Sequence, residues 1–84
     1  MDDIELIFRE SAFEHGLSEA DIRFAINNFV YDEVIAGDET KRLLIGLDKN
    51  ARLLEIIYNE IDELTVNVFH AMICQKKYLR YLEK

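Results

Sequence analysis

The residues best suited to chemistry lie at the end of the chain, in the stretch HAMICQKKYLRYLEK from His70 to Lys84. It holds one of two histidines, the only cysteine and four of ten basic residues. An imidazole moves protons near neutral pH, and cationic side chains bind phosphate. We therefore predict a site where His70 acts as a general acid or base beside an anionic ligand. The alternative is a sheet histidine satisfied by a backbone carbonyl.

The basic cluster consists of Lys76, Lys77 and Arg80, and helical spacing makes Lys76 and Arg80 neighbours. It forms either a phosphate clamp beside His70 or a solvated helix face. Tyr78 and Tyr81 either stack on nucleic-acid bases or pack against the sheet, and for Tyr78 packing is favoured.

Three other residues are candidates at greater sequence distance. Arg42 and Arg52 flank a predicted central hairpin and extend the basic patch. His15 caps the end of a predicted helix, with catalysis as the alternative. Cys74 is expected to be a small buried residue, because no nucleophilic triad surrounds it. The sequence has no spacing typical of zinc or calcium ligands and no glycine-rich phosphate loop, so neither a metal nor a cofactor is predicted.

Two helices are predicted to precede the strands. The first covers residues 2–15, with Asp2 or Asp3 as its N-cap, and ends at Gly16. The second begins at Ser18, because SEAD at 18–21 matches a capping box with Asp21 reaching back. Apolar residues on the helical period predict the buried positions, which are Ile4, Ile7, Phe8, Ser11 and Ala12 in the first helix and Ile22, Ala25, Ile26 and Phe29 in the second.

Short strands follow, and the chain then returns to helical spacing from Met72. DKNA at 48–51 suits a hairpin loop, and LTVNVFH alternates so that Val66, Val68 and His70 share one face. We predict a single α+β domain over residues 1–84, with two N-terminal helices, a four-stranded antiparallel sheet covered on one face, and a C-terminal helix.

Charge is divided unevenly along the chain. The net charge is −7, but residues 1–40 carry eleven acidic and two basic side chains, whereas residues 41–84 carry six and eight. This acidity argues against non-specific nucleic-acid binding and leaves a restricted contact near the C-terminus. The acidic part is a solvated face or a docking surface for a basic partner. No apolar run approaches the ~20 residues of a membrane span, so a cytoplasmic protein without membrane contact is expected.

Three motifs in order, EHGLS, RLLIGLDKNARLLEIIYNE and VFHAMICQKKYLRYL, resemble the BrnT-like toxins of bacterial type II toxin–antitoxin systems, within the RelE-like ribonuclease group. The resemblance covers roughly residue 14 to the end. It implies a compact α+β fold, metal-independent endoribonuclease cleavage of mRNA, and a cognate DNA-binding antitoxin, with a homodimer or a heterotetramer as the possible assemblies.

On this resemblance His15 matches the histidine of the His-Gly stretch, His70-Ala71 matches the junction after the last strand, and Met72 stands where an arginine is common. The first hypothesis is an endoribonuclease, with His70, Arg80 and Lys77 catalytic, Lys76, Arg52, Arg42 and Tyr81 contacting RNA, and His15 accessory. The second is a non-catalytic interaction module or degenerate toxin of the same fold, which Met72 and the acidity favour.

Overall fold

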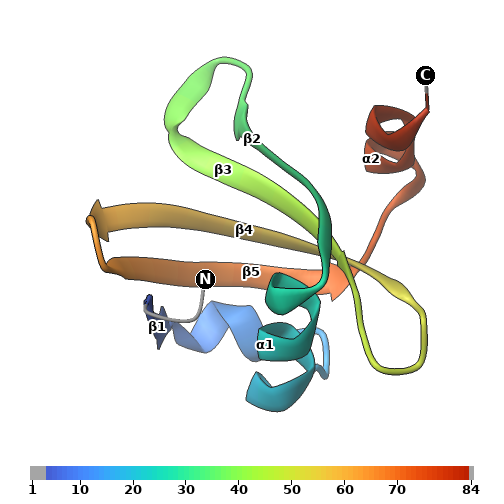
Figure 1. Cartoon of the computed structure of the whole chain (residues 1–84), viewed down its shortest axis with the longest axis horizontal. Helices are drawn as coiled ribbons and strands as arrows, with labels where there is room; N and C mark the ends of the chain where they lie inside the picture. Colours follow the sequence, from blue (N-terminus) through green and yellow to red (C-terminus); the bar gives the residue numbers. More distant parts are fainter. Residues whose placement is uncertain (1–3, 84) are drawn as a thin grey trace.

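Five strands form one mixed sheet in the order β1-β5-β4-β3-β2 (Figure 1). The computed structural model describes residues 4–83, so Asp2 and Asp3, the predicted N-caps, lie outside it. The strands are β1 Glu5–Phe8, β2 Phe29–Ile35, β3 Asp38–Leu47, β4 Leu53–Asp62 and β5 Thr65–Ile73. The helical elements are the 3-10 helix η1 Glu10–Phe13, α1 Glu19–Asn27, α2 Lys76–Leu79 and the 3-10 helix η2 Arg80–Leu82. The α+β class is confirmed, and β2 to β5 form the predicted antiparallel part.

The predicted first helix is wrong, because its residues form strand β1 and then η1. Strand β1 pairs in parallel with β5, from Glu5 opposite Thr65 to Phe8 opposite Val68. Leu6 and Phe8 pack against the core on the two-residue period of a strand. Ile7, predicted to be buried, is 40% exposed. Pairing with a strand 60 residues away outweighs the local helical pattern.

Helix α1 begins where the capping box predicts. The Ser18 hydroxyl accepts from the Asp21 backbone N–H, and the Asp21 carboxylate accepts from the Ser18 N–H. Ile22, Ala25 and Ile26 are buried as expected. Phe29 is half exposed because it lies in β2 rather than on the helix.

Helix α1 lies unusually close to the sheet at Gly46 of β3. A Cβ at Gly46 would lie 2.0 Å from the Ala25 carbonyl oxygen and 2.7 Å from its carbon. Only a residue without a side chain allows this approach. The resulting interface buries Leu44, Leu54 and Ile56 on the side of the sheet that faces α1.

The strand pairing divides the buried residues between two faces of the sheet. Leu44, Leu54 and Ile56 face α1, and Leu43 and Ile45 face the other side. The C-terminal segment packs there, where η2 contacts β2. It is shorter than the predicted helix from Met72, because β5 continues to Ile73 before α2 begins. Within residues 4–83, no helix is both long enough and apolar enough to cross a membrane.

Candidate functional site

A β-bulge in β5 decides where His70 points. Val68 pairs with Tyr58, but His70 pairs with Ile57, so Phe69 is the extra residue between the two pairs. Because Ile57 and Tyr58 face opposite sides of β4, Val68 and His70 do as well. The prediction that His70 shares a face with Val66 and Val68 is therefore wrong. Ala71 enters the core instead, and His70 joins the face opposite α1.

The His70 imidazole contacts a carboxylate that is fully buried. His70 Nε2 lies 2.8 Å from Glu55 Oε2, and the Glu55 residue is 0% exposed. The backbone N–H of Gln75 donates to Glu55 Oε1 at 2.8 Å, and its side-chain amide donates to Oε2 at 2.9 Å. A buried carboxylate requires such partners, because burial of an unpaired charge is costly.

This network assigns the protons of the His70 ring. An ionised carboxylate only accepts hydrogen bonds, so the Nε2 that faces Glu55 carries a hydrogen. Nδ1 is then the nitrogen with a free lone pair when the ring is neutral. The arrangement can hold one tautomer and stabilise the charge that forms when Nδ1 takes up a proton.

The second histidine lies against the first. The His15 and His70 ring centroids are 5.6 Å apart, and the rings meet edge to face at 76°. His15 reaches this position from the turn after η1, where Gly16 has a φ of +84°. Ser11 fixes that helix by donating its hydroxyl to the Phe69 carbonyl at the bulge. The bulge therefore helps to position both imidazoles, because it orients His70 and anchors η1, which precedes His15.

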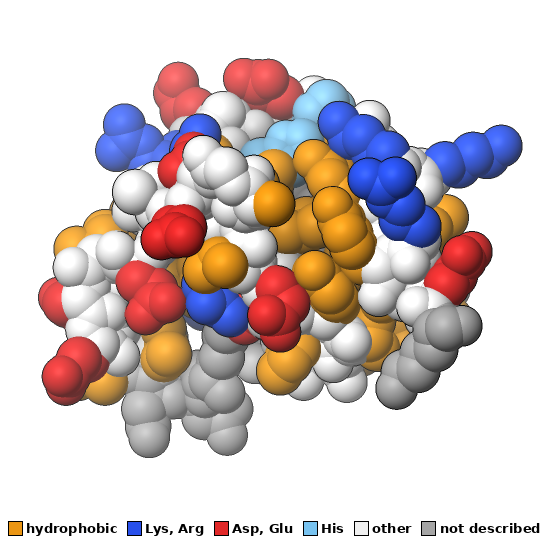
Figure 2. Space-filling model, turned by 90° about the horizontal axis from the view of Figure 1, so that it is seen from above, with side chains coloured by type: hydrophobic (Ala, Val, Ile, Leu, Met, Phe, Trp, Pro, Cys, Tyr) orange, Lys and Arg blue, Asp and Glu red, His pale blue; other side chains and the backbone are white. Residues whose placement is uncertain are grey.

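The basic cluster begins next to this pair. Gln75, which holds Glu55, immediately precedes Lys76 and α2. Figure 2 shows Lys and Arg side chains on the surface immediately beside the two histidines. The Lys77 ammonium lies 5.0 Å from the centre of the Tyr78 ring, and the Arg80 guanidinium 5.7 Å from the centre of Tyr81. Helix α2 thus starts at the carboxylate that orients His70.

Arg42 does not join the histidines. It lies on the opposite face, where its Nε is 3.1 Å from Asp32 Oδ1 and 3.2 Å from the Tyr58 hydroxyl. Burial lowers the Arg42 pKa, but the hydrogen bond and charge of Asp32 outweigh it and raise the value. Burial and then Asp32 raise the Tyr58 pKa well above its usual range. This cluster is an internal ion pair between β2, β3 and β4, and an RNA contact by Arg42 stays a prediction.

Arg52 lies in the loop between β3 and β4. Its Nε is 2.7 Å from Asp48 Oδ2, and the Asp48 carboxylate also accepts from the backbone N–H groups of Asn50 and Arg52. The predicted hairpin loop is confirmed, and Arg52 has a role in closing it. Its contact with RNA also stays a prediction.

Cys74 lies near the Glu55 carboxylate that contacts His70. Burial, followed by the charge of Glu55, raises the pKa of the Cys74 thiol. A thiol in this setting is a weak nucleophile at neutral pH. Cys74 is only partly buried, so the prediction of a buried residue is wrong. No group of three or more metal-ligating side chains occurs in the part of the chain that the structure describes.

Sequence reasoning missed Glu55 and Gln75, which orient His70. The signal for Glu55 was present, because RLLEIIY places one acidic residue inside a strand of buried apolar residues. An ionisable residue at such a position needs a partner, and His70 was the available candidate. Gln75 fell within the helix predicted from Met72, which concealed its position as the residue that precedes α2.

The fold of this chain is similar to that of a protein of known structure. The solved structure in question is the crystal structure of the Brucella abortus ribonuclease toxin, BrnT, which matches with a TM-score of 0.61 at 16% identity over 87% of this chain and 99% of that chain. The likeness shows that the two proteins share a fold, as the resemblance implied. No protein-family model matches the sequence, and no curated protein is similar to it in sequence.

Proposed function

We propose that this chain acts as a single-domain toxin of a type II toxin–antitoxin system and cleaves RNA without a metal ion. The observation that carries the proposal is the His70 imidazole, held by the buried Glu55 and adjoining His15. The shared fold supports it, because the protein of that structure is described as a ribonuclease toxin. The placement of basic residues at the start of α2 adds binding groups for an anionic substrate.

The reaction requires one base, one acid and stabilisation of negative charge. Nδ1 of His70 takes the proton of the ribose 2′-hydroxyl, whose oxygen forms a bond to the adjacent phosphorus. The bond from phosphorus to the 5′ oxygen breaks, and the His15 imidazolium donates a proton to this leaving oxygen. Glu55 orients His70 and stabilises its positive charge. The products are a 2′,3′-cyclic phosphate and a 5′-hydroxyl.

The cations at α2 act on the phosphate. Lys77 and Arg80 stabilise the charge that develops on its oxygens, and Lys76 binds the neighbouring backbone. Tyr81 contacts a base. Met72, which pairs with Glu55 in the sheet, offers no charge where the resembling toxins commonly have arginine, so α2 supplies the cations in this chain.

The test measures cleavage of a single-stranded RNA in excess chelator. His70→Gln keeps a donor for Glu55 but removes the base, so we expect a loss of at least about 100-fold in rate. His15→Gln should also slow the reaction. Lys49→Ala, at an exposed position between β3 and β4, is the matched control. Equal cleavage by wild type and His70→Gln would remove this assignment.

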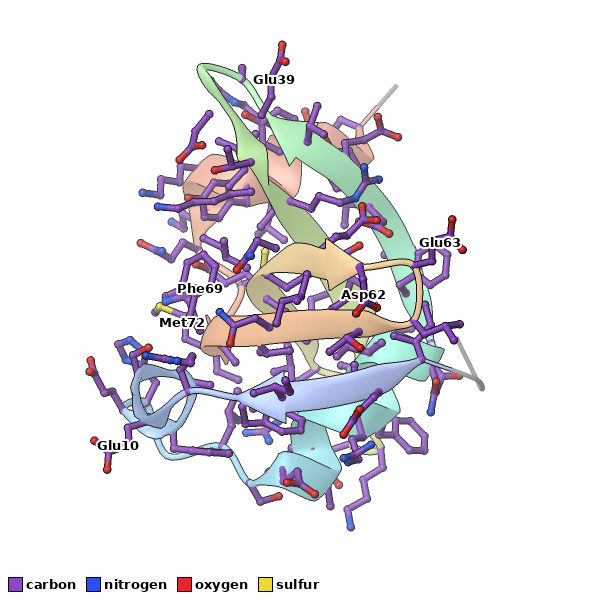
Figure 3. All side chains as sticks on the ribbon, turned by 90° about the vertical axis from the view of Figure 1, so that its left-hand side faces the viewer. Glu10, Glu39, Asp62, Glu63, Phe69 and Met72 are labelled. Atoms are coloured by element: carbon purple, nitrogen blue, oxygen red, sulfur yellow. The ribbon has the colours of Figure 1, made fainter. Side chains whose placement is uncertain are left out.

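An interaction module of the same fold is the second candidate, and the tip between β4 and β5 favours it. Ile61 and Leu64 are 55% and 60% exposed there, beside the acidic Asp62 and Glu63. Figure 3 shows Asp62 and Glu63 at this end of the sheet, far from Glu10 and Met72. Exposed apolar side chains rimmed by acid suit a basic partner protein such as a DNA-binding antitoxin.

The two candidate functions differ in their expected effect on cell growth. Induced expression should arrest growth if the chain is an active toxin, and co-expression of the antitoxin should relieve that arrest. A module without catalytic activity binds the partner but causes no arrest with either the wild type or His70→Gln. A homodimer or a heterotetramer with antitoxin remains a prediction.

A further inference from the structure

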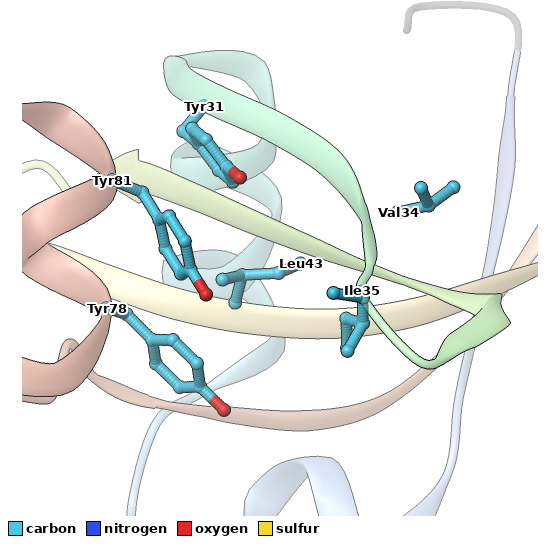
Figure 4. Close-up of a pocket in the computed structure, with 7 residues that line it drawn as sticks. Tyr31, Val34, Ile35, Leu43, Tyr78 and Tyr81 are labelled. Atoms are coloured by element: carbon cyan, nitrogen blue, oxygen red, sulfur yellow. The ribbon is translucent and has the colours of Figure 1, made fainter.

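A small aromatic hollow lies between the C-terminal segment and the hairpin of β2 and β3 (Figure 4). Its volume is about 160 Å³, and its lining residues are Tyr31, Val34, Ile35, Ala36, Leu43, Tyr78 and Tyr81. Pockets for whole drug-sized ligands are larger, at roughly 300–1,000 Å³. The hollow therefore fits one planar ring system and not a complete nucleotide.

Three tyrosines form one wall of this hollow. Tyr81 stacks on Tyr31 with centroids 5.3 Å apart and on Tyr78 with centroids 6.3 Å apart. Figure 4 shows the hydroxyl of Tyr81 beside Leu43, while that of Tyr78 is not directed at Leu43 or Ile35. The aliphatic side chains offer apolar surface to the faces of a ring, and the hydroxyls offer both donors and acceptors to its edge. A nucleobase has this combination of apolar faces and a polar edge.

The hollow is on the same face of the sheet as the two histidines. Leu43 pairs with Ile57, and Ile57 pairs with His70, so the three residues form a row across β3, β4 and β5. Two strand spacings separate the ends of this row, or about 10 Å. Adjacent nucleotides of an extended single strand can bridge such a separation.

Two basic side chains lie next to the tyrosines that line the hollow. Lys77 and Arg80 lie over the rings of Tyr78 and Tyr81, on the segment that follows Gln75, the residue that donates hydrogen bonds to Glu55. An RNA strand from the imidazoles to the hollow would keep its phosphates beside these side chains. Aromatic surfaces with interleaved cations are typical of single-strand binding.

We propose that the hollow is a nucleobase subsite that binds the base of a nucleotide adjoining the scissile phosphate, and that it thereby sets the base preference of cleavage. This inference rests on the proposed endoribonuclease function. It assigns base recognition to Tyr78, Tyr81 and the hairpin residue Ala36, and leaves proton transfer to the histidines.

The test titrates the full chain with each of the four nucleoside 3′-monophosphates, and with inorganic phosphate, while NMR follows the tyrosine ring signals. We expect one nucleotide to shift the Tyr78 and Tyr81 signals at the lowest concentration, and inorganic phosphate to leave them unchanged. Ala36→Leu fills the hollow from an exposed turn position and should raise the Kd at least about tenfold. The double variant Tyr78→Phe/Tyr81→Phe keeps the stacking and should raise the Kd about three- to tenfold.

Phe24→Leu, an exposed aromatic change on α1, is the control and should leave the Kd unchanged. On a cleaved RNA, Ala36→Leu should raise KM with little change in kcat. Ring signals that respond equally to inorganic phosphate, or a Kd that Ala36→Leu leaves unaltered, would overturn the subsite. If His70-dependent cleavage is observed but no base binds in the hollow, only the subsite is contradicted. If a base binds in the hollow but RNA is not cleaved, the nuclease function is contradicted and base binding in the hollow is not.

Discussion

Replacement of Glu55 by Gln perturbs the candidate site at its most buried point. The wild-type carboxylate accepts three hydrogen bonds, one from His70 and two from Gln75, at 2.8–2.9 Å. In Glu55→Gln, the remaining oxygen keeps the bond from the Gln75 backbone. The new amide group can donate to the Gln75 side chain, once that amide rotates, and to His70 Nε2, once the ring proton moves to Nδ1. All three bonds are retained without charge.

The expected loss of stability follows from this count. Hydrogen bonds to charged groups contribute about 1.5–3 kcal/mol and neutral ones about 0.5–1.5 kcal/mol, so three bonds lose about 3 kcal/mol together. Part of this loss is offset because a charge is no longer buried. We expect the free energy of unfolding to fall by about 2 kcal/mol, which lowers Tm by roughly 8–16 °C for a domain of this size.

The expected loss of activity is larger. The displaced proton occupies Nδ1, the nitrogen that would take the proton of the 2′-hydroxyl. A carboxylate-to-amide change behind a catalytic histidine costs about 10⁴-fold in a serine protease through the same change of tautomer. We expect RNA cleavage in chelator to fall by about 10³–10⁴-fold, while Glu63→Gln, on an exposed acid in the tip between β4 and β5, changes neither property.

Three measurements check this prediction. Thermal unfolding followed by circular dichroism gives Tm, RNA cleavage gives the rate, and nitrogen NMR of the His70 ring gives the tautomer. The neutral ring should carry its proton on Nε2 in the wild type and on Nδ1 in Glu55→Gln. An unchanged Tm together with an Nδ1 proton already present in the wild type would refute the reasoning.

Two further predictions concern the fold. Gly46→Ala places a methyl group against the Ala25 backbone and forces α1 away from the sheet, so it should lower the free energy of unfolding by about 3 kcal/mol or more. Gly37→Ala is the comparison: its φ of +87° strains any side chain, but the added methyl group lies in open space, so the loss should be about 1–2 kcal/mol. Ala25→Gly should not rescue Gly46→Ala, since the contacted atoms are backbone; denaturant unfolding checks the order, and equal costs at both glycines would contradict it. Asp48→Asn should destabilise the protein at pH 7: burial alone would raise the Asp48 pKa, but the hydrogen bonds from Arg52 and Asn50 lower it below its usual 3.8. Because the pKa of Asp48 is lower in the folded state than in the unfolded state, its contribution to stability is present above about pH 4 and is lost as the pH falls through the folded-state pKa. The Tm values of wild type and variant should therefore converge in acid. A constant difference in Tm down to pH 2 would count against this role.

How far the sequence predicted the fold depended on the distance over which each signal acts. The capping box from Ser18 to Asp21 and the loop at 48–51 are local, and both predictions hold. Strand β1 was missed because its stability comes from parallel pairing with β5, which no local pattern reports. The same residues, with Leu6 and Phe8 inward, also satisfy a two-residue period.

Both histidines of the candidate site were named from the sequence, but their geometry was not predicted. His15 and His70 were both named, and the structure brings their rings together. The bulge at Phe69 could not be inferred from alternation, because it depends on how β4 and β5 pair. Glu55 is a lone acid within an apolar strand, which the sequence shows, but its contact with His70 exists only because the bulge turns His70 to the face opposite α1.

The central claim is that the 2′-hydroxyl of RNA attacks its own phosphate under the control of His70. The most direct measurement identifies the ends left on a short RNA after incubation with the protein in chelator. We predict a 2′,3′-cyclic phosphate and a 5′-hydroxyl from wild type, no cleavage where one 2′-deoxynucleotide replaces the reacting one, and no comparable product from His70→Gln. Cleavage of the 2′-deoxy substrate, or the same ends at the same rate from His70→Gln, would contradict it.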